Sequence, residues 1–349
     1  IFIGLEIMSI SSYILVGMKR KVSISNEAAL KYLMLGAFSS GFLLYGISLL
    51  YGATGSTYLP KIIESLQDQQ LLRNPLAIAG VGLVIISMGF KIAIVPFHMW
   101  TPDVYTGAPT PVTGFLSAAA KAAGFAVFLR VLLTGMPMEE ENWKYLLWIL
   151  SALTMTVGNL MALRQSSIKR MLAYSSIAHA GYVMIAAVAG SPAALSGIFF
   201  YSTAYALMGT GAFGILTIRD LGKVPQTFDD LSGYAKRFPL PAFLMTLFML
   251  SLVGLPLTGG FIAKLQIFKA ALEEGWVWLT VIAVLNSALS VYYYLRVVVC
   301  MYMREGAVAE GQAKQSSTMP GFAITGLAGT ALAVLYLGIF PEAMLELAS

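Results

Sequence analysis

Long apolar stretches, separated by short polar segments, follow one another along the whole chain. Ten can be drawn, at about residues 1–17, 28–52, 74–96, 110–134, 143–163, 171–190, 193–218, 240–262, 276–302 and 320–340, and the eighth continues to about residue 274. Most of them match the roughly 20 residues that a helix needs to cross the hydrocarbon core of a bilayer. The pattern therefore predicts an all-α polytopic membrane protein with about ten transmembrane helices.

Two of these segments contain residues that interrupt a helix. Pro96 follows the apolar run from Pro75 to Phe90, and "SLVGLPLTGGF" (Ser251–Phe261) holds Pro256 among three glycines. Proline removes a backbone hydrogen bond and clashes with the preceding turn, and the freed backbone groups cannot face lipid. Interrupted helices in membrane transporters often mark an ion path near the bilayer midplane. We therefore predict two broken helices whose breaks face protein or water.

Composition and charge agree with this fold. Hydrophobic residues make up 58% of the chain and charged residues 11%, against about 25% charged in a soluble domain. Basic residues collect in cytoplasmic loops, which places the first residue outside and the loops after odd-numbered segments inside. Those loops hold Lys19, Arg20, Lys21, Arg164, Lys169, Arg170, Arg219, Lys223, Lys236, Arg237, Arg304 and Lys314. The net charge of +5 thus reflects topology, and we expect no nucleic-acid partner.

The chain offers little material for a cofactor site of its own. Its single cysteine, Cys300, and its two histidines, His98 and His179, do not suggest a disulfide, an iron–sulfur cluster or another metal centre. "GTGAFG" (Gly209–Gly214) lies within an apolar segment, whereas a dinucleotide fingerprint follows a strand. We expect no cofactor, metal or redox centre in this chain. Because the sequence opens inside an apolar segment, we also expect further helices to precede it.

Charged residues inside the apolar segments are the candidate functional residues. Lys91, Lys121 and Lys264 have no short route to the surface, and a charge at that depth costs about 2.5–3.5 kcal/mol. Burial among apolar groups disfavours the charged form of a lysine, whereas a nearby carboxylate favours it. A Glu partner, for which Glu6 beside Lys91 is the candidate, could therefore switch a lysine between holding and releasing a proton. With His179 and ordered water, these residues would form a proton relay.

Structural roles remain open for the same residues. Buried Glu and Lys could form static pairs that fix helix register, above all at Lys31, which we expect to lie close to the start of its helix. His98, beside the first break, could hold backbone carbonyls rather than carry protons. We expect Asp103 to cap a loop or a short helix, and the tyrosine and tryptophan clusters to be interfacial anchors.

The segment "FKIAIVPFHMWTPDVYTGAPTPVTGFLSAAAKAAGF" resembles the signature of the antiporter-like membrane subunits of respiratory complex I, the proton-pumping NADH–quinone oxidoreductase. "TPDVYTGAPTP" (Thr101–Pro111) is similar to the subunit N type, which is called subunit 2 in organelles. Further matches are "NEAALKYLMLGAFSSGFLLYGISLLYG" (Asn26–Gly52), "SIKRMLAYSSIAHAGY" (Ser167–Tyr182) and "GLPLTGGFIAKL" (Gly254–Leu265). The resemblance covers essentially the whole chain.

The resemblance implies an antiporter-like fold of about fourteen helices in two inverted five-helix repeats, of which this chain would lack the N-terminal helices. Residues 1–349 would form a single transmembrane domain. Within it, residues 1–134 would be the remainder of the first repeat, residues 143–303 the second repeat and residues 320–349 a C-terminal helix.

The resemblance also implies a set of relay residues, at Glu6, Lys31, Lys91, Lys121 and Lys264, with His98 and His179 at positions where the family often has histidine. Proton movement would be driven by quinone reduction in partner subunits, which would hold NADH or another electron donor, flavin, iron–sulfur clusters and quinone. The expected partners are a neighbouring antiporter-like subunit, small membrane subunits and the lipid bilayer, in a bacterial inner membrane or an organellar energy-transducing membrane. Two other functions remain open, a sodium/proton antiporter subunit without redox coupling and a purely structural membrane module.

Overall fold

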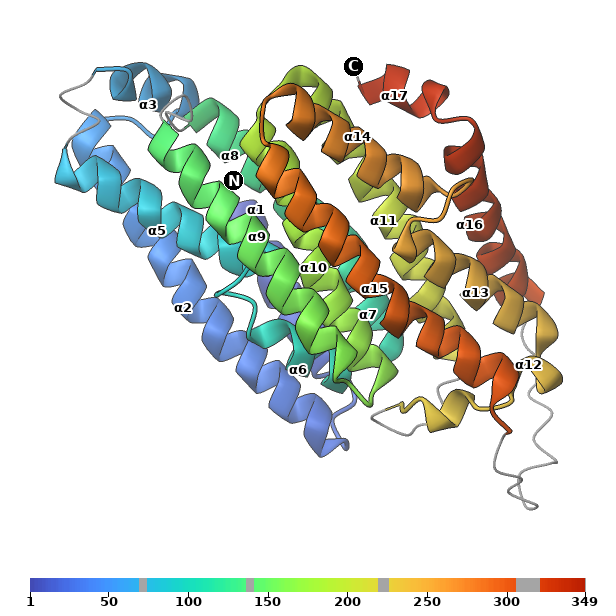
Figure 1. Cartoon of the computed structure of the whole chain (residues 1–349). Coiled ribbons are helices and arrows are strands. Elements are labelled where there is room, and N and C mark those ends of the chain that lie inside the picture. The colour runs from blue at the N-terminus through green and yellow to red at the C-terminus, as the bar shows by residue number, and fades with distance from the viewer. Residues whose placement is uncertain (69–73, 136–140, 219–225, 306–320, 349) are drawn as a thin grey trace.

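The fold is a bundle of long, slanted helices, with α2 and α5 at one edge and α13, α14 and α16 at the other (Figure 1). The computed structural model describes residues 1–68, 74–135, 141–218, 226–305 and 321–348. Within these ranges the only β pairing is an isolated bridge between Ser167 and Thr227. Eight helical stretches of the described residues are long and apolar enough to cross a membrane, and α1 and α13 are shorter apolar helices. The prediction of an all-α polytopic membrane protein is confirmed.

The helices follow the predicted segments in order. They are α1 (Phe2–Val16), α2 (Ser23–Thr54), α3 (Leu59–Leu66), α5 (Pro75–Ile92), α6 (Trp100–Gly107), α7 (Thr110–Phe115), η1 (Leu116–Ala120), α8 (Lys121–Gly135), α9 (Glu141–Leu163), α10 (Ile168–Ala189), α11 (Pro192–Ile218), η2 (Asp229–Leu231), α12 (Tyr234–Arg237), α13 (Pro239–Val253), α14 (Gly259–Glu273), α15 (Val277–Met303), α16 (Gly321–Ile339) and α17 (Glu342–Ala348). α2 begins at Ser23 rather than near residue 28. Lys31 therefore lies more than two turns into its helix, not close to its start as expected.

Both predicted breaks are present, and protein groups satisfy the backbone that they free. In the first break, between α5 and α6, the Val95 N–H donates to Thr154 Oγ1 at 3.0 Å, and the indole of Trp100 donates to the Phe90 carbonyl at 2.9 Å. In the second, between α13 and α14, the Gly260 N–H donates to the Ser251 hydroxyl at 3.2 Å. Because lipid offers no hydrogen bonds, such internal partners are what a broken membrane helix needs.

A third irregularity was not predicted. Residues Leu116–Ala120 form a π-helical turn, η1, that runs directly into α8 at Lys121. No proline or glycine lies within this turn, so the sequence pattern gave no warning of it. Single π-helical turns inside α-helices occur often at functional sites. Each of the three deeply buried lysines, Lys91, Lys121 and Lys264, thus lies beside an interruption of regular helix.

Helix α10 is the centre of the bundle, and the sequence explains why it packs so closely. Its apolar stretch is buried along its whole length, and glycines bring α9 within van der Waals distance of it. A Cβ on Gly158 would lie 2.6 Å from the backbone nitrogen of Ala178, and one on Gly181 would lie 2.6 Å from the backbone nitrogen of Met155. Small residues allow this kind of backbone approach between membrane helices.

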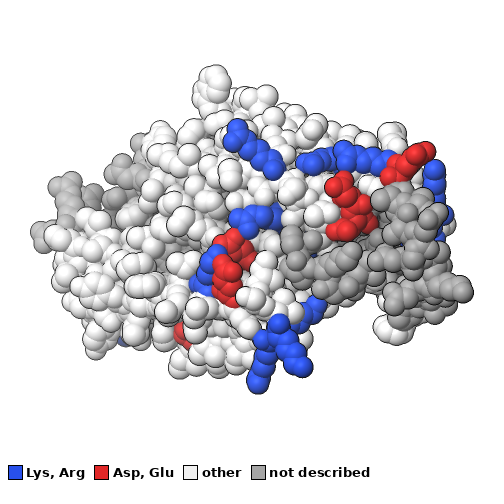
Figure 2. Space-filling model, turned by 90° about the horizontal axis from the view of Figure 1, so that it is seen from below, with Lys and Arg blue, Asp and Glu red and all other residues white. Residues whose placement is uncertain are grey.

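Lysine and arginine side chains gather on the end of the bundle that Figure 2 shows from below, as a cytoplasmic face requires. Four residues of the predicted loop set lie in helices instead, Lys169 and Arg170 in α10 and Lys236 and Arg237 in α12. Of these, Lys169 departs most from the prediction. Lys169 is not in a loop but in the first turn of α10, where its side chain is 1% exposed and donates to the Ala108 carbonyl at 2.7 Å. Of the other predicted loop residues, Arg219, Lys223 and Lys314 lie outside the described residues.

Substitution of Gly181 by alanine tests the contact between α9 and α10. We expect Gly181→Ala to lower the free energy of unfolding by about 1–3 kcal/mol, because an added methyl group overpacks a close backbone contact. Gly82→Ala is the matched control, since a Cβ there would meet nothing within 4 Å. Unfolding of the purified protein in detergent measures both variants, and equal stability of the two would contradict the close contact.

Candidate functional site

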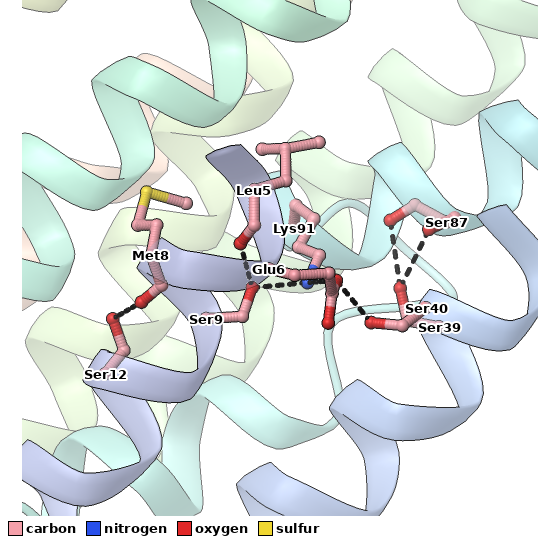
Figure 3. Close-up of polar contacts among 9 residues, drawn as sticks. All are labelled: Leu5, Glu6, Met8, Ser9, Ser12, Ser39, Ser40, Ser87 and Lys91. Atoms are coloured by element: carbon pink, nitrogen blue, oxygen red, sulfur yellow. Dashed lines mark hydrogen bonds and ion pairs between the residues drawn. The ribbon is translucent and has the colours of Figure 1, made fainter. Parts of the chain in front are cut away.

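The first part of the site is a charged cluster that joins α1, α2 and α5 (Figure 3). Lys91 lies in the last turn of α5, and its Nζ atom is 3.5 Å from Glu6 Oε1 and donates to Ser9 Oγ at 2.5 Å. The side chains of Lys91 and Glu6 are only 5% and 22% exposed. The hydroxyl of Ser40 donates to the same Glu6 oxygen at 2.6 Å. One carboxylate oxygen of α1 therefore contacts both α2 and α5.

The contact between Glu6 and Lys91 is loose compared with the other bond of the same carboxylate. At 3.5 Å it is longer than the 2.6 Å bond from Ser40 to the same oxygen. A closer carboxylate favours the charged amine, and a more distant one favours the neutral amine.

The second part of the site is Lys121, at the start of α8. Its side chain is buried, and Nζ donates to both the carbonyl and the hydroxyl oxygen of Ser176 on α10, each at 2.5 Å. Beside it lies a cavity of about 20 Å³ lined by Lys121, His179 and Tyr201 among others. One ordered water needs about 10–15 Å³ and two or more polar partners. The cavity therefore has room for one water between the lysine and the histidine.

His179, on α10, connects the second part of the site with the third. Its Nδ1 atom is 2.6 Å from the Tyr201 hydroxyl and its Nε2 atom is 3.0 Å from the Tyr294 hydroxyl. The ring lies close enough to Lys121 and Lys264 to interact with the charge of each. A neutral imidazole accepts a hydrogen bond on one nitrogen and donates one from the other. Both nitrogens of His179 therefore have a tyrosine hydroxyl as hydrogen-bond partner.

The third part of the site is Lys264 on α14. Its buried amine donates to the Val253 carbonyl at 2.8 Å, the Leu252 carbonyl at 3.2 Å and the Ser287 hydroxyl at 2.9 Å. The two carbonyls belong to the last turn of α13, where the helix breaks. The amine also lies 5.0 Å from the ring centroid of Tyr182. The break thus supplies the acceptors for the lysine beside it.

Two of the predicted relay residues lie apart from these three parts. Lys31 is 45% exposed and pairs with Glu27 at 2.8 Å and with Asp103 at 2.9 Å. His98 lies in the first break, where it interacts with the Pro96 backbone. Among the described residues, its Nδ1 atom is one of the few buried polar atoms without a hydrogen-bond partner. The structure brings neither residue to Lys91, Lys121 or Lys264.

The prediction that Asp103 caps a helix is wrong. The N-cap of α6 is Met99, and no side-chain bond caps this helix. Asp103 instead accepts from Lys31 of α2 and, at 2.6 Å, from Arg170 of α10. Each of the two carboxylate oxygens of Asp103 thus bonds a cation on a neighbouring helix. These ion pairs take the place of a bond to the backbone at the start of α6. Asp103 therefore fastens α6 to α2 and α10.

Sequence reasoning missed the hydroxyl groups that surround His179. Tyr201 and Tyr294 are buried, and Tyr294 also bonds Ser175, so the tyrosine cluster of α15 is not only an interfacial anchor as expected. Tyr292 is exposed, but its neighbours Tyr293 and Tyr294 face the interior. The available signal was the spacing of Ser175, Ser176 and His179 on one apolar helix, which places polar groups where no solvent reaches them.

The chain is similar to known membrane subunits along its whole length. Residues 1–290 match the family model described as "NADH:quinone oxidoreductase/Mrp antiporter, TM". NADH-quinone oxidoreductase subunit N of Trichlorobacter lovleyi is 52% identical over 307 residues, which are 88% of this chain and 63% of that protein. The chain thus spans less than two thirds of the length of this relative.

Solved structures give the same result for the fold. A chain of respiratory complex I from Thermus thermophilus with bound aureothin superposes with a TM-score of 0.82 at 37% identity, over 99% of this chain and 74% of its own length. A chain of the Mrp complex from Dietzia sp. DQ12-45-1b superposes with a TM-score of 0.87 at 21% identity, over 99% of this chain and 72% of its own. The second likeness concerns the fold alone.

The ion pair between Asp103 and Arg170 can be tested with a double-mutant cycle. Asp103→Asn and Arg170→Gln each remove the same contact. We therefore expect the sum of their two losses in unfolding free energy to exceed the loss in the double variant by about 0.5–1 kcal/mol. Unfolding in detergent gives these energies. Asp103→Asn combined with Arg304→Gln is the control, since Arg304 pairs with Asp229 instead. Strict additivity of the first pair would contradict the fastening role.

Proposed function

Because the chain belongs to the NADH:quinone oxidoreductase/Mrp antiporter transmembrane family, we propose that it is a proton-translocating membrane subunit of an NADH–quinone oxidoreductase. In this proposal the chain performs no redox chemistry. It moves protons through a relay of buried Glu and Lys side chains that responds to quinone reduction elsewhere in the complex. The observation that carries the proposal is the series Lys91, Lys121 and Lys264, three buried amines that each lie beside a helix interruption.

The first step of the relay concerns the pair of Glu6 and Lys91. When the carboxylate approaches, the amine holds its proton, and when it withdraws, the amine releases the proton toward Lys121. Helices α5 and α8 are in contact there, since a Cβ on Gly124 would lie 3.8 Å from the Lys91 carbonyl. The proton must therefore cross a helix contact, and we assign to the neighbouring break at Pro96 the role of admitting water.

The second step runs from Lys121 through His179 to Lys264. One water in the cavity between Lys121 and His179 would link the amine with the ring, and the ring interacts with the charges of both lysines. His179 suits the step because an imidazole has two ring nitrogens, one of which can accept a proton while the other donates one. Lys31 and Asp103 lie at the exposed end of the bundle, where we propose that Lys31 delivers protons to the relay from the aqueous side. His98 has no assigned step.

The proposed partners follow from the family. Other subunits would hold NADH or another electron donor, flavin, iron–sulfur clusters and quinone. A neighbouring antiporter-like subunit and small membrane subunits would contact this chain in the bilayer, and the apolar side chains that α2 and α15 expose suit such contacts.

The main alternative is a sodium/proton antiporter subunit without redox coupling. The fold does not separate the two functions, because the Mrp chain shares it at 21% identity. The identity of 52% to a subunit N favours the redox-coupled complex. A purely structural module is less favoured, because three buried amines are costly in a membrane unless they serve a purpose.

Purification of the native complex distinguishes these functions. We expect an affinity-tagged version of the full chain, isolated from its own membranes in mild detergent, to retain flavin and iron–sulfur subunits that oxidise NADH or another donor. Absorption and electron paramagnetic resonance spectra would detect these groups. Retention of antiporter subunits alone, without redox centres, would establish the alternative.

Substitution of the relay lysines tests the mechanism. We expect Lys91→Ala and Lys121→Ala to reduce proton pumping several-fold while the complex still assembles. Lys121→Arg should also be impaired, because arginine does not deprotonate in proteins. Lys269→Ala is the matched control, since that lysine is exposed and pairs only with Glu273. Proton uptake by inside-out membrane vesicles measures the effect, and normal pumping in both alanine variants would reject the relay.

A further inference from the structure

Lys264 differs from Lys91 because no carboxylate lies near it. The helices that pack against α14 are α10, α11, α13, α15 and α16, and none of the five contains an aspartate or a glutamate. On α14 itself the only acidic residue is Glu273, at the far end of the helix, where it pairs with Lys269 at 3.7 Å. Within the described part of the chain, the ammonium form of Lys264 must therefore be stabilised without an anion.

Neutral groups take the place of the missing anion. The two carbonyls of Leu252 and Val253 end α13 and carry the negative end of its helix dipole, and Ser287 offers a hydroxyl oxygen. These three acceptors use all three N–H donors of an ammonium. The remaining neighbour is the ring of Tyr182, whose centroid is 5.0 Å from Nζ. An aromatic face within about 6 Å of a cation attracts it, and more strongly when water is excluded.

We propose that the aromatic face of Tyr182 stabilises the ammonium form of Lys264 in place of a carboxylate. In this way it sets the pH range in which the lysine keeps its proton. The inference rests on the proposed function, since it concerns the last lysine of the relay. It assigns Tyr182 a role that its hydroxyl does not explain. Unlike the carboxylate of Glu6 beside Lys91, an aromatic face attracts a cation without itself ionising.

The surroundings of Tyr182 hold its ring in place. Its hydroxyl accepts from Asn159 of α9 at 3.3 Å, and Asn159 is itself held by Asn286 and Tyr293 of α15. The ring meets the His179 ring edge-on, with centroids 5.7 Å apart and an interplanar angle of 77°. The polar network thus engages the hydroxyl and leaves the ring face to Lys264.

Few other groups near Lys264 change charge close to neutral pH. His179 comes from α10, Tyr201 and Tyr205 from α11, and Tyr293 and Tyr294 from α15, while α13 has no titratable residue and Tyr336 of α16 is exposed. Phenols ionise only at strongly alkaline pH. Apart from Lys264, the groups with a basic nitrogen along this part of the relay are therefore His179 and Lys121.

The test compares three substitutions at Tyr182 in the assembled complex. Tyr182→Phe keeps the ring and loses the hydroxyl, Tyr182→3,4,5-trifluorophenylalanine keeps the shape but withdraws electrons from the face, and Tyr182→Leu removes the ring. Protons pumped per electron are measured in inside-out vesicles between about pH 5.5 and 9. Tyr182→Phe is the reference for the other two, because it keeps the ring face while it loses the bond from Asn159. Pumping is expected to fall at alkaline pH, where Lys264 loses its proton. Relative to Tyr182→Phe, the other two variants should lower the pH of half-maximal pumping on this side by about one unit, because a face that attracts the ammonium less favours its proton less.

The isosteric fluorinated variant keeps the test valid if Tyr182→Leu does not assemble. If it keeps the profile of Tyr182→Phe, the inference is overturned. A uniform loss of pumping without a shift along the pH axis also overturns it, because that result indicates packing alone. Tyr292→Leu, on the exposed side of α15, is the control and should match the wild type.

Lys264→Ala separates this inference from the function on which it rests. Normal pumping by Lys264→Ala would reject the relay itself at this residue and the inference with it. Loss of pumping in Lys264→Ala, together with an unshifted profile in the fluorinated variant, would overturn only the role of Tyr182. Loss of pumping in Lys264→Ala together with a shifted pH profile in the fluorinated variant would support both the relay and the role of Tyr182.

Discussion

An ammonium group inside a bilayer must have acceptors for its three N–H bonds, and this requirement shapes the interior of the protein. An unbroken α-helix has few spare acceptors, because its carbonyls are engaged in its own hydrogen bonds. Lys264 finds two of its acceptors at the point where α13 ends, and Lys121 finds a carbonyl and a hydroxyl of Ser176. For Lys264 the helix interruption and the buried amine are thus parts of one arrangement, whereas Lys91 and Lys121 find their acceptors on α1 and on the unbroken helix α10.

The acceptors differ in kind from one lysine to the next, and the difference bears on how protons could move in one direction. Lys91 has a carboxylate partner at 3.5 Å and a serine hydroxyl. Lys121 has the hydroxyl and carbonyl of a single serine and a small cavity beside it. Lys264 has a helix end and an aromatic ring, which cannot move independently of the bundle. A signal that displaces α1 would therefore act first on Lys91.

The sequence predicted most of the fold because proline, glycine and apolar length act locally. Pro96 and Pro256 mark both breaks correctly, and the positions of the long helices follow from hydrophobicity. The π-helical turn before Lys121 has no such local marker, since alanine, serine and leucine suit an ordinary helix equally well. Its presence depends on how α8 packs against its neighbours, which a single sequence does not show.

Side-chain partners were harder to predict than helices for the same reason. Asp103 has the residue type and position of a cap, but Lys31 and Arg170, which are distant in sequence, compete for it. Lys169 follows a loop in sequence, yet its amine reaches the end of α6. The tyrosines around His179 come from α11 and α15. Helix neighbours had to be known before any of these contacts could be expected.

The complete enclosure of α10 has a consequence for how the membrane itself acts on the protein. Acyl chains have little access to the apolar residues of this helix, because other helices surround its apolar stretch. Bilayer thickness, fluidity and headgroup charge can therefore reach Ser176 and His179 only as forces transmitted through the outer helices. The electrostatic surroundings of these two residues are therefore set by the helices that pack against α10 rather than by lipid.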